Sequence, residues 1–386
     1  MFLPVEKKLV LSLGSIYTAR MLGLFMILPV LSTFASEFTG AEPLTIGFAI
    51  GVYGLVQALC QFPSGWLSDT WGRRKILLWS LGFLILGGVI AAEAESIWGV
   101  ILGRAVQGTG AMTSVVLAMV ADHARLEVRS KVMAILGILI GTAFLLAMML
   151  GPWIAGNFGL RGVFWVLSGL GVVAYGIAYQ YLPQDVTPLA TDTLERGPWW
   201  KPEYGFLFTG IGVLHVVVAA MFLVLPTSLV MEHGIPKESH AWVYVPVLLG
   251  SLVFLWPLLK YARDQVGMLR SMPYMISLLT LSTAGVMVLP TTYGVIAALI
   301  AFFVAFNWLE AALPAFVSIV APSQHRGRVM GVYATCQFLG IFVGGAVGGA
   351  IVKYFGVVGL VIFLVALQGI WLTQSVCLGR QSWRVA

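Results

Sequence analysis

The stretch Gly65-Trp-Leu-Ser-Asp69-Thr-Trp-Gly72-Arg73-Arg74-Lys75 stands between two long apolar runs of the chain. Gly65 would let two helices approach each other closely, and Gly72 would permit a tight reversal of the backbone. Asp69, at a helix end, can accept hydrogen bonds from the N-terminus of another helix, and Arg73 offers a planar fork to a carboxylate. The alternative is an ordinary basic loop. The fixed spacing favours a structured joint between two helices.

The composition around this joint is that of a membrane protein. Hydrophobic residues make up 59% of the 386 residues and charged residues only 10%, whereas soluble domains are roughly 25% charged. A membrane helix needs about 20 mostly apolar residues, and the ~10-residue alternating segments of a β-barrel are absent. The chain holds twelve suitable runs, at approximately residues 9–34, 44–68, 76–95, 97–122, 130–155, 161–182, 204–231, 240–262, 270–290, 292–320, 327–353 and 357–379. We therefore expect an all-α membrane protein.

A polar, proline-containing interval at 183–203 divides the runs into six and six. This predicts an N-terminal six-helix bundle at 1–182, a linker at 183–203 and a C-terminal six-helix bundle at 204–386. A shift of 197 positions places Phe158-Gly159 on Phe355-Gly356 and Arg129–Met133 on Arg326–Met330. A chance match of glycine-rich segments is the alternative. The ungapped agreement favours an internal repeat, which is typical of transporters with a site between their halves.

The basic residues predict the orientation in the membrane. Lys and Arg gather on the side that holds both termini, and only Arg161, Lys237 and Lys353 fall on the other side. By the positive-inside rule both termini are then cytoplasmic, in the inner membrane of a bacterium. This placement explains the net charge of +6 without a nucleic-acid partner. The three cysteines are scattered in apolar stretches, so neither a disulfide nor a metal site is expected.

The quoted stretch resembles the signature loop of the major facilitator superfamily, G-x-L-x-D-x-x-G-R-[RK]-[RK]. Two further segments agree. Arg104-Ala-Val-Gln107-Gly-Thr-Gly110 is similar to the family's R-x-x-Q-G-x-G element. Ala147-Met-Met-Leu-Gly151-Pro152-Trp-Ile-Ala155-Gly156 is close to the G-x-x-x-G-P-x-x-G-G element of its antiporters, with Ala in place of Gly at 147 and 155. Nearly the whole chain resembles the YajR-type bacterial proton-driven efflux transporters.

The resemblance implies a twelve-helix fold of two six-helix, pseudo-symmetric halves, with the first, fourth, seventh and tenth spans lining a central cavity. It implies an antiporter-like fifth span, where we expect Pro152 to bend the helix and Gly151 and Gly156 to permit close packing. It also implies a conformational latch formed by Gly65, Asp69, Gly72, Arg73, Arg74 and Asp122, in which Asp69 meets the start of the eleventh span near 327–330. YajR-type transporters can carry a soluble domain after the last helix, which we expect this chain to lack.

Four ionisable residues lie deep inside spans: Arg20, Arg104, His215 and Glu310. Charged groups in lipid are costly and mark functional sites by default. Glu310 is the only deep carboxylate, so it is the first candidate for a proton carrier. The arginines can pair with it, and His215 can share or carry the proton instead. Each can also be structural: the arginines as carbonyl donors between helices, His215 as a neutral hydrogen bonder and Glu310 as a fixed partner.

Polar side chains on nearby spans are weaker candidates for substrate contacts: Tyr53, Gln57, Gln61, Gln107, Asn307, Tyr333 and Gln337. Two arginines against one carboxylate argue against a polycation as substrate. We expect export of a drug-like molecule or metabolite by a monomer, with protons as coupling ion and no cofactor. Proton-coupled import, or transport of a sugar or organic anion, stays open. A membrane-embedded enzyme is less favoured because the sequence has no known catalytic motif.

Overall fold

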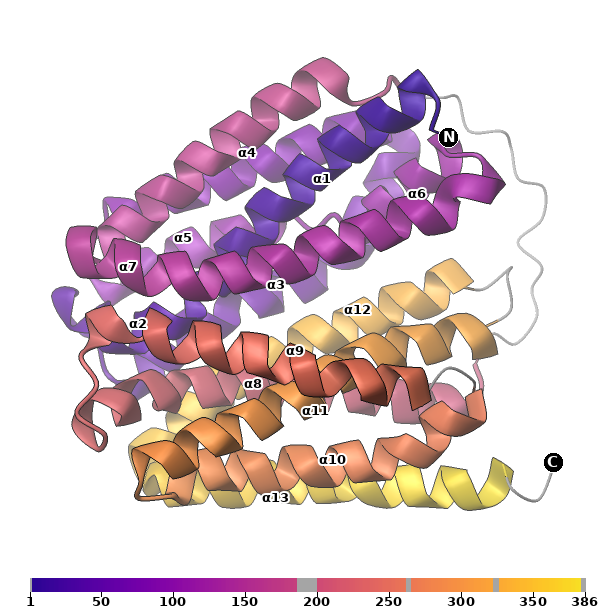
Figure 1. Ribbon diagram of the computed structural model, residues 1–386. Coiled ribbons are helices and arrows are strands. Elements are labelled where there is room, and N and C mark those ends of the chain that lie inside the picture. Colours follow the sequence, from indigo (N-terminus) through magenta and orange to yellow (C-terminus); the bar gives the residue numbers. More distant parts are fainter. Residues whose placement is uncertain (1, 186–199, 262–264, 322–325, 383–386) are drawn as a thin grey trace. The chain divides into compact units, whose positions relative to one another are not determined.

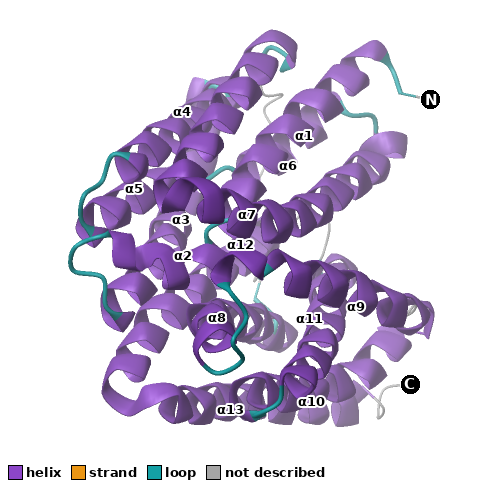
Figure 2. Ribbon diagram, turned by 60° about the vertical axis from the view of Figure 1, so that its left-hand side comes forward, coloured by secondary structure: helices purple, strands orange, loops and turns teal. Residues whose placement is uncertain are grey.

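A computed structural model describes residues 2–185, 200–261, 265–321 and 326–382 as a set of helices joined by short turns (Figure 1, Figure 2). The α-helices are α1 Pro4–Phe25, α2 Leu28–Phe34, α3 Pro43–Trp71, α4 Arg73–Ala92, α5 Ile97–Thr109, α6 Thr113–His123, α7 Leu126–Tyr181, α8 Pro202–Met231, α9 Ala241–Tyr261, α10 Gln265–Val288, α11 Thr292–Val320, α12 Arg326–Phe342 and α13 Gly348–Ser382. Short 3₁₀ turns occur at Ala35–Glu37 (η1) and Lys237–Ser239 (η2), and a π-helical turn at Val343–Val347 (η3) joins α12 to α13. The all-α fold class is confirmed.

Ten helical segments in the described part of the chain are long and apolar enough to cross a membrane. Two of them, Glu127–Tyr181 with 55 residues and Arg328–Cys377 with 50, would extend about 75–83 Å at 1.5 Å per residue. A bilayer core is only about 30 Å thick, so each of these two segments accounts for two crossings. The ten segments therefore supply the twelve crossings that the sequence predicts.

Each double-length segment reverses at a glycine of the predicted repeat. Gly159 in α7 has φ 66° and ψ −178°, and Gly356 in α13 has φ 67° and ψ −173°. A β-carbon on Gly162 would lie 2.3 Å from Cβ of Phe158, and one on Gly359 would lie 2.5 Å from Cβ of Phe355. The two halves of the sequence thus contain the same reversal, with an aromatic residue folded over a glycine four positions later.

The chain forms two compact units. The first comprises Met1–Ala41 and Val52–Pro198, and the second comprises Glu42–Gly51 and Trp199–Ala386. Helix α3 therefore contributes its first turns to the second unit and the rest of its length to the first. Most of the predicted linker, 186–199, lies outside the described residues, and the predicted domain boundaries stay a prediction.

The first and fourth apolar runs are each interrupted rather than continuous. Helix α1 ends at Phe25 and α2 begins at Leu28, and a β-carbon on Gly151 of α7 would meet the carbonyl oxygen of Met26 at 2.8 Å. Gly151 therefore packs on the break between α1 and α2. Helix α7 keeps helical dihedral angles around Pro152, and its interruption lies at Gly159.

The fourth run breaks between α5 and α6, next to Gly110. The Gly110 carbonyl accepts a hydrogen bond of 2.5 Å from Ser80, and a β-carbon at Gly110 would lie 2.9 Å from a guanidinium nitrogen of Arg20. Broken helices free backbone polar groups, which are tolerated at membrane depth only where protein or a cavity satisfies them. This break therefore brings an intramembrane arginine next to freed backbone.

Candidate functional site

Three polar side chains from three helices of the second unit meet within its interior. The side-chain nitrogen of Gln337 (α12) lies 2.8 Å from Nε2 of His215 (α8) and 3.3 Å from Oε1 of Glu310 (α11). His215 Nε2 is 3.9 Å from Glu310 Oε2. We call these three residues the carboxylate cluster.

The hydrogen bonds of the carboxylate cluster define its protonation pattern. His215 Nδ1 lies 3.1 Å from the carbonyl oxygen of Ile211, which can only accept, so Nδ1 carries the proton. An amide nitrogen can only donate, so the Gln337 nitrogen donates to Nε2, which leaves the imidazole neutral. The same amide group donates to the Glu310 carboxylate. One neutral amide therefore joins the imidazole and the carboxyl group by donating to both.

Access to the carboxylate cluster differs between its members. The side chain of Glu310 is 38% exposed, whereas that of His215 is only 8% exposed. Tyr333, one turn before Gln337 on α12, is buried. Asn307, which sequence reasoning grouped with these residues, has its amide nitrogen 3.5 Å from Oγ of Ser251. A proton arriving from water would thus reach Glu310 before His215.

The two intramembrane arginines are brought together in the first unit. Arg20 of α1 donates to the side-chain oxygen of Gln57 and, at 3.3 Å, to Oγ of Ser80. Arg104 of α5 donates to Gln107 at 2.9 Å and to the Gly23 carbonyl at 3.2 Å. These partners are all neutral.

The ring of Tyr53 lies beneath both cations of this pair. The guanidinium carbon of Arg104 is 4.6 Å and that of Arg20 is 5.6 Å from the ring centroid, which is within cation–π range. Arg104 is fully buried, yet its Nε and one Nη have no hydrogen-bond partner within the described part of the molecule. Buried polar groups of this kind are usually paired, whereas these two donors are unsatisfied within the described part of the molecule.

Sequence reasoning listed Tyr53, Gln57 and Gln107 as possible substrate contacts, and the structure places all three against the arginines. The side-chain oxygens of Gln57 and Gln107 are occupied by these cations. Gln61 is buried one turn further along α3, away from these hydrogen bonds, and its backbone carbonyl lies 3.5 Å from Oγ of Ser114.

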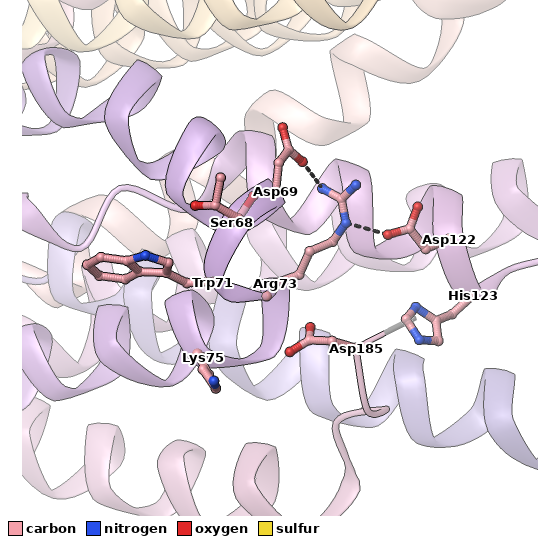
Figure 3. A pocket seen from close by; sticks show the side chains of 10 residues that line it. Ser68, Asp69, Trp71, Arg73, Lys75, Asp122, His123 and Asp185 are labelled. Atoms are coloured by element: carbon pink, nitrogen blue, oxygen red, sulfur yellow. Dashed lines mark hydrogen bonds and ion pairs between the residues drawn. The ribbon is translucent and has the colours of Figure 1, made fainter. Parts of the chain in front are cut away.

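The signature stretch forms the turn between α3 and α4, and Arg73 lies at its centre. Arg73 Nε donates to the carboxylate of Asp122, and an Nη atom lies 3.3 Å from Oδ1 of Asp69 (Figure 3). The side chain of Arg73 is 19% exposed, Asp122 31% and Asp69 62%. The two carboxylates flank the guanidinium at the mouth of a pocket of about 290 Å³. The predicted proximity of Arg73 to Asp122 is thus present, whereas the expected contact of Asp69 with the start of α12 stays a prediction.

Asp185 belongs to this turn, although sequence reasoning assigned it to the linker. Its Oδ1 accepts from the backbone nitrogen of Arg74 at 2.8 Å, in the first turn of α4. The Arg74 guanidinium donates to the carbonyl oxygens of Leu182 at 3.2 Å and Tyr179 at 2.5 Å. The α4 N-terminus and the α7 C-terminus therefore cap each other: a carboxylate meets the positive helix end and a guanidinium the negative one.

Gly72 makes this mutual capping possible. It has φ 100°, and a β-carbon there would lie 2.1 Å from Asp185 Oδ2. Gly65 is less constrained, since its β-carbon would lie 3.3 Å from Oγ of Ser114. The sequence signal for Asp185 was an acid three residues after the sixth apolar run, on the same side of the membrane as the signature turn.

A second missed contact lies at the other end of α3, within the second unit. A β-carbon on Gly47 would lie 2.3 Å from the carbonyl oxygen of Gly345, and one on Gly349 would lie 2.5 Å from that of Pro43. Lys353 forms an ion pair of 2.8 Å with Glu42, just before α3. Glycines thus bring the two backbones into direct contact, as in closely packed membrane helices.

Comparison with known proteins places this geometry in context. The family model described as Major Facilitator Superfamily matches residues 13–345. The inner membrane transport protein YajR of Escherichia coli is 36% identical over 379 residues, which cover 96% of this chain and 83% of YajR. An uncharacterized transporter of Buchnera aphidicola, BU466, is 31% identical over 353 residues, 88% of this chain and 89% of that protein. The crystal structure of a bacterial homologue of the human lysosomal transporter Spinster superposes with a TM-score of 0.77 at 15% identity, covering 100% of this chain and 98% of that one.

Proposed function

Because the chain belongs to the major facilitator superfamily, and is therefore a multi-pass membrane transporter of a small molecule rather than an enzyme, we propose that it exports its substrate in exchange for protons. We place it in the bacterial inner membrane with both termini cytoplasmic. The distribution of basic residues and the name of the YajR relative support this placement.

The observation that carries the proposal is the carboxylate cluster of Glu310, Gln337 and His215. Glu310 is the only Asp or Glu deep within an apolar run, and its side chain is partly exposed, so protons can reach it. A coupling group must take up a proton with access to one side of the membrane and release it with access to the other. A partly exposed carboxylate beside a neutral imidazole meets this requirement.

The cluster has two complementary hydrogen-bonding states. With Glu310 ionised, the Gln337 amide donates to both the carboxylate and the imidazole. Once Glu310 is protonated, its hydroxyl becomes a donor and, after a small rotation, can replace the Gln337 amide at His215 Nε2, which is 3.9 Å from Glu310 Oε2. Protonation therefore replaces a charged arrangement with a neutral one, which is cheaper to carry through a low-dielectric interior.

The two intramembrane arginines of the first unit, Arg20 and Arg104, favour one class of substrate. Arg20 and Arg104 have neutral partners only within the described structure, and Arg104 keeps two unpaired donors. Uncompensated cations disfavour a polycation and favour a neutral or anionic small molecule with hydrogen-bond acceptors. The antiporter-like segment around Gly151 and Pro152 supports export over import.

The proposal is tested with Glu310→Gln, which fixes a neutral side chain of nearly the same shape. A compound panel in an efflux-deficient strain first identifies a substrate. Proteoliposomes with an imposed pH gradient then measure its uphill movement. We expect Glu310→Gln to abolish pH-driven accumulation while it retains exchange of labelled for unlabelled substrate. Glu232→Gln, at an exposed carboxylate after α8, is the matched control and should behave as wild type.

Two outcomes would contradict the proposal. If Glu310→Gln still concentrates substrate with normal pH dependence, Glu310 is structural and His215 becomes the leading proton carrier. If expression of the wild-type protein raises rather than lowers the cellular content of the substrate, the protein is a proton-coupled importer.

A further inference from the structure

An apolar groove on the first unit is bounded by α1 and by both arms of α7, the segments before and after Gly159. The groove has a volume of about 470 Å³, within the ~300–1,000 Å³ typical of ligand pockets. Helices α1 and α7 pack side by side along much of their length (Figure 1). Its lining is apolar apart from two hydroxyl groups, those of Ser15 and Thr18.

The groove is open rather than part of the packed core. Leu11 on its α1 wall is 51% exposed and Val173 on its α7 wall is 60% exposed. Gly14 deepens the groove, because a β-carbon there would lie 2.8 Å from Cδ1 of Leu139. All of these residues lie inside membrane-spanning segments. A surface of this kind at membrane depth is covered by hydrocarbon.

One end of the groove carries positive charge. Lys7 precedes Leu11 and Ser15 by four and eight positions on α1, and Lys131 precedes Ile135 and Leu139 by four and eight positions on α7. Residues at i and i+4 share a helix face, so each lysine stands at the end of a wall of the groove. Both lysines are exposed, and no ion pair or hydrogen bond joins either side chain to another described residue.

The two lysine-bearing helix ends are held together. Glu6, next to Lys7, accepts hydrogen bonds from the backbone nitrogen of Leu3 at 2.7 Å and from Nε of Arg125 at 2.8 Å, at the start of α7. The Glu6 side chain is 1% exposed, and this contact raises the pKa of Arg125. Glu6 is therefore paired with Arg125, and the exposed Glu127, one turn before Lys131, also lies 3.9 Å from Arg125. The described structure pairs neither acid with Lys7 or Lys131, whose charges remain available at this end of the groove.

We propose that this groove binds an anionic phospholipid, with one acyl chain against the apolar walls and the phosphate between Lys7 and Lys131. Clustered basic side chains at the membrane surface attract anionic lipids, and basic sites between membrane helices hold their head groups. Phosphatidylglycerol would satisfy both parts of the site, whereas a zwitterionic lipid would satisfy only the apolar part. The lipid would bridge α1 and both arms of α7.

The test uses the full chain purified in detergent, titrated with phosphatidylglycerol or phosphatidylcholine of identical acyl chains and followed by native mass spectrometry. We expect one phosphatidylglycerol to be retained, and the double variant Lys7→Gln/Lys131→Gln to bind it about thirtyfold more weakly. The matched control Lys201→Gln/Lys260→Gln removes two exposed lysines outside the groove and should bind as wild type. Ser15→Trp fills the groove with both lysines intact and should weaken binding of either lipid.

Three results would overturn the proposal. The first is equal retention of both lipids by the wild-type protein. The second is equal loss of phosphatidylglycerol from the Lys7/Lys131 variant and the control variant. The third is competition by glycerol phosphate as strong as that by the lipid, which would show that the apolar walls contribute nothing. Thermal unfolding in the same detergent without added lipid checks that every variant is folded, and Ser15→Leu replaces Ser15→Trp should the latter fail to fold.

Discussion

The side-chain nitrogen of Gln337 lies 2.8 Å from Nε2 of His215, so a neutral amide from α12 satisfies the one ring nitrogen that faces a carboxylate. Gln337 also lies 3.3 Å from Oε1 of Glu310, so one amide group links the imidazole and the carboxyl group of the carboxylate cluster.

Replacing Gln337 should weaken the coupling between the members of the cluster. Gln337→Leu removes the amide that donates to both His215 and Glu310. We expect this variant to lower pH-driven accumulation of substrate, which proteoliposomes with an imposed pH gradient measure. Gln180→Leu, at an exposed glutamine of α7, is the control. Unchanged accumulation would show that Gln337 has no such role.

The Arg73 ion pairs should be unequal in strength. The Asp122 carboxylate is less exposed than that of Asp69, and exposed ion pairs contribute only about 0.2–1 kcal/mol. A double-mutant cycle with Arg73→Gln and Asp122→Asn should give a coupling near 1 kcal/mol, and one with Asp69→Asn a value near zero. Denaturant titration in mixed micelles measures both. A stronger coupling to Asp69 would reverse this order.

Asp69 should matter for transport although its ion pair with Arg73 contributes little to stability. If Asp69 engages the start of α12 during the cycle, Asp69→Asn lowers transport at unchanged protein level and stability. Normal transport by this variant would show that Asp69 does not act as a latch.

The sequence predicted those features that depend on composition and on local spacing. Twelve apolar runs and the repeat at 197 positions follow from patterns that a single sequence contains, and the proximity of Arg73 to Asp122 follows from the resemblance of the signature stretch to that of the family. The breaks at Met26 and Gly110 were not predicted, because the apolar runs continue through them and only packing against other helices frees the backbone there.

Pairings between distant residues were the hardest to predict. The sequence suggested that the intramembrane arginines tune Glu310, but their described partners are the amides, hydroxyl and carbonyl of the first unit. Sequence reasoning also listed Gln337 only as a possible substrate contact. Its bridging role depends on the register of α8, α11 and α12, which no local pattern encodes.

Gly72 and Asp185 should be energetically coupled. Gly72→Ala places a methyl group where Asp185 Oδ2 lies and forces an L-residue to φ 100°, a conformation that costs about 1–3 kcal/mol. Asp185→Ala removes the clash with Oδ2 and leaves the strain of the positive φ. Gly72→Ala should therefore destabilise the Asp185→Ala protein less than the wild type, as measured by denaturant titration. Equal destabilisation in the two backgrounds would mean that the Asp185 side chain moves aside with no loss of unfolding free energy.

The two reversal glycines offer a matched pair within one molecule. Gly159→Ala and Gly356→Ala impose the same backbone strain, about 1–3 kcal/mol each, because both residues have φ near 66°. The two sites differ in their surroundings. A methyl group at 159 would lie 2.9 Å from a carboxylate oxygen of Glu37, and this oxygen accepts from the backbone nitrogen of Leu160 at 3.1 Å. A methyl group at 356 would meet no other atom within 4 Å. Gly159→Ala should therefore lower the unfolding free energy more than Gly356→Ala, and Glu37→Ala should remove most of the difference.

Gly169→Ala, in an open helical position of α7, controls for the loss of glycine flexibility and should stabilise by about 0.5–1 kcal/mol. Equal losses at 159 and 356 would show that Glu37 moves aside freely and does not cap the second arm of α7.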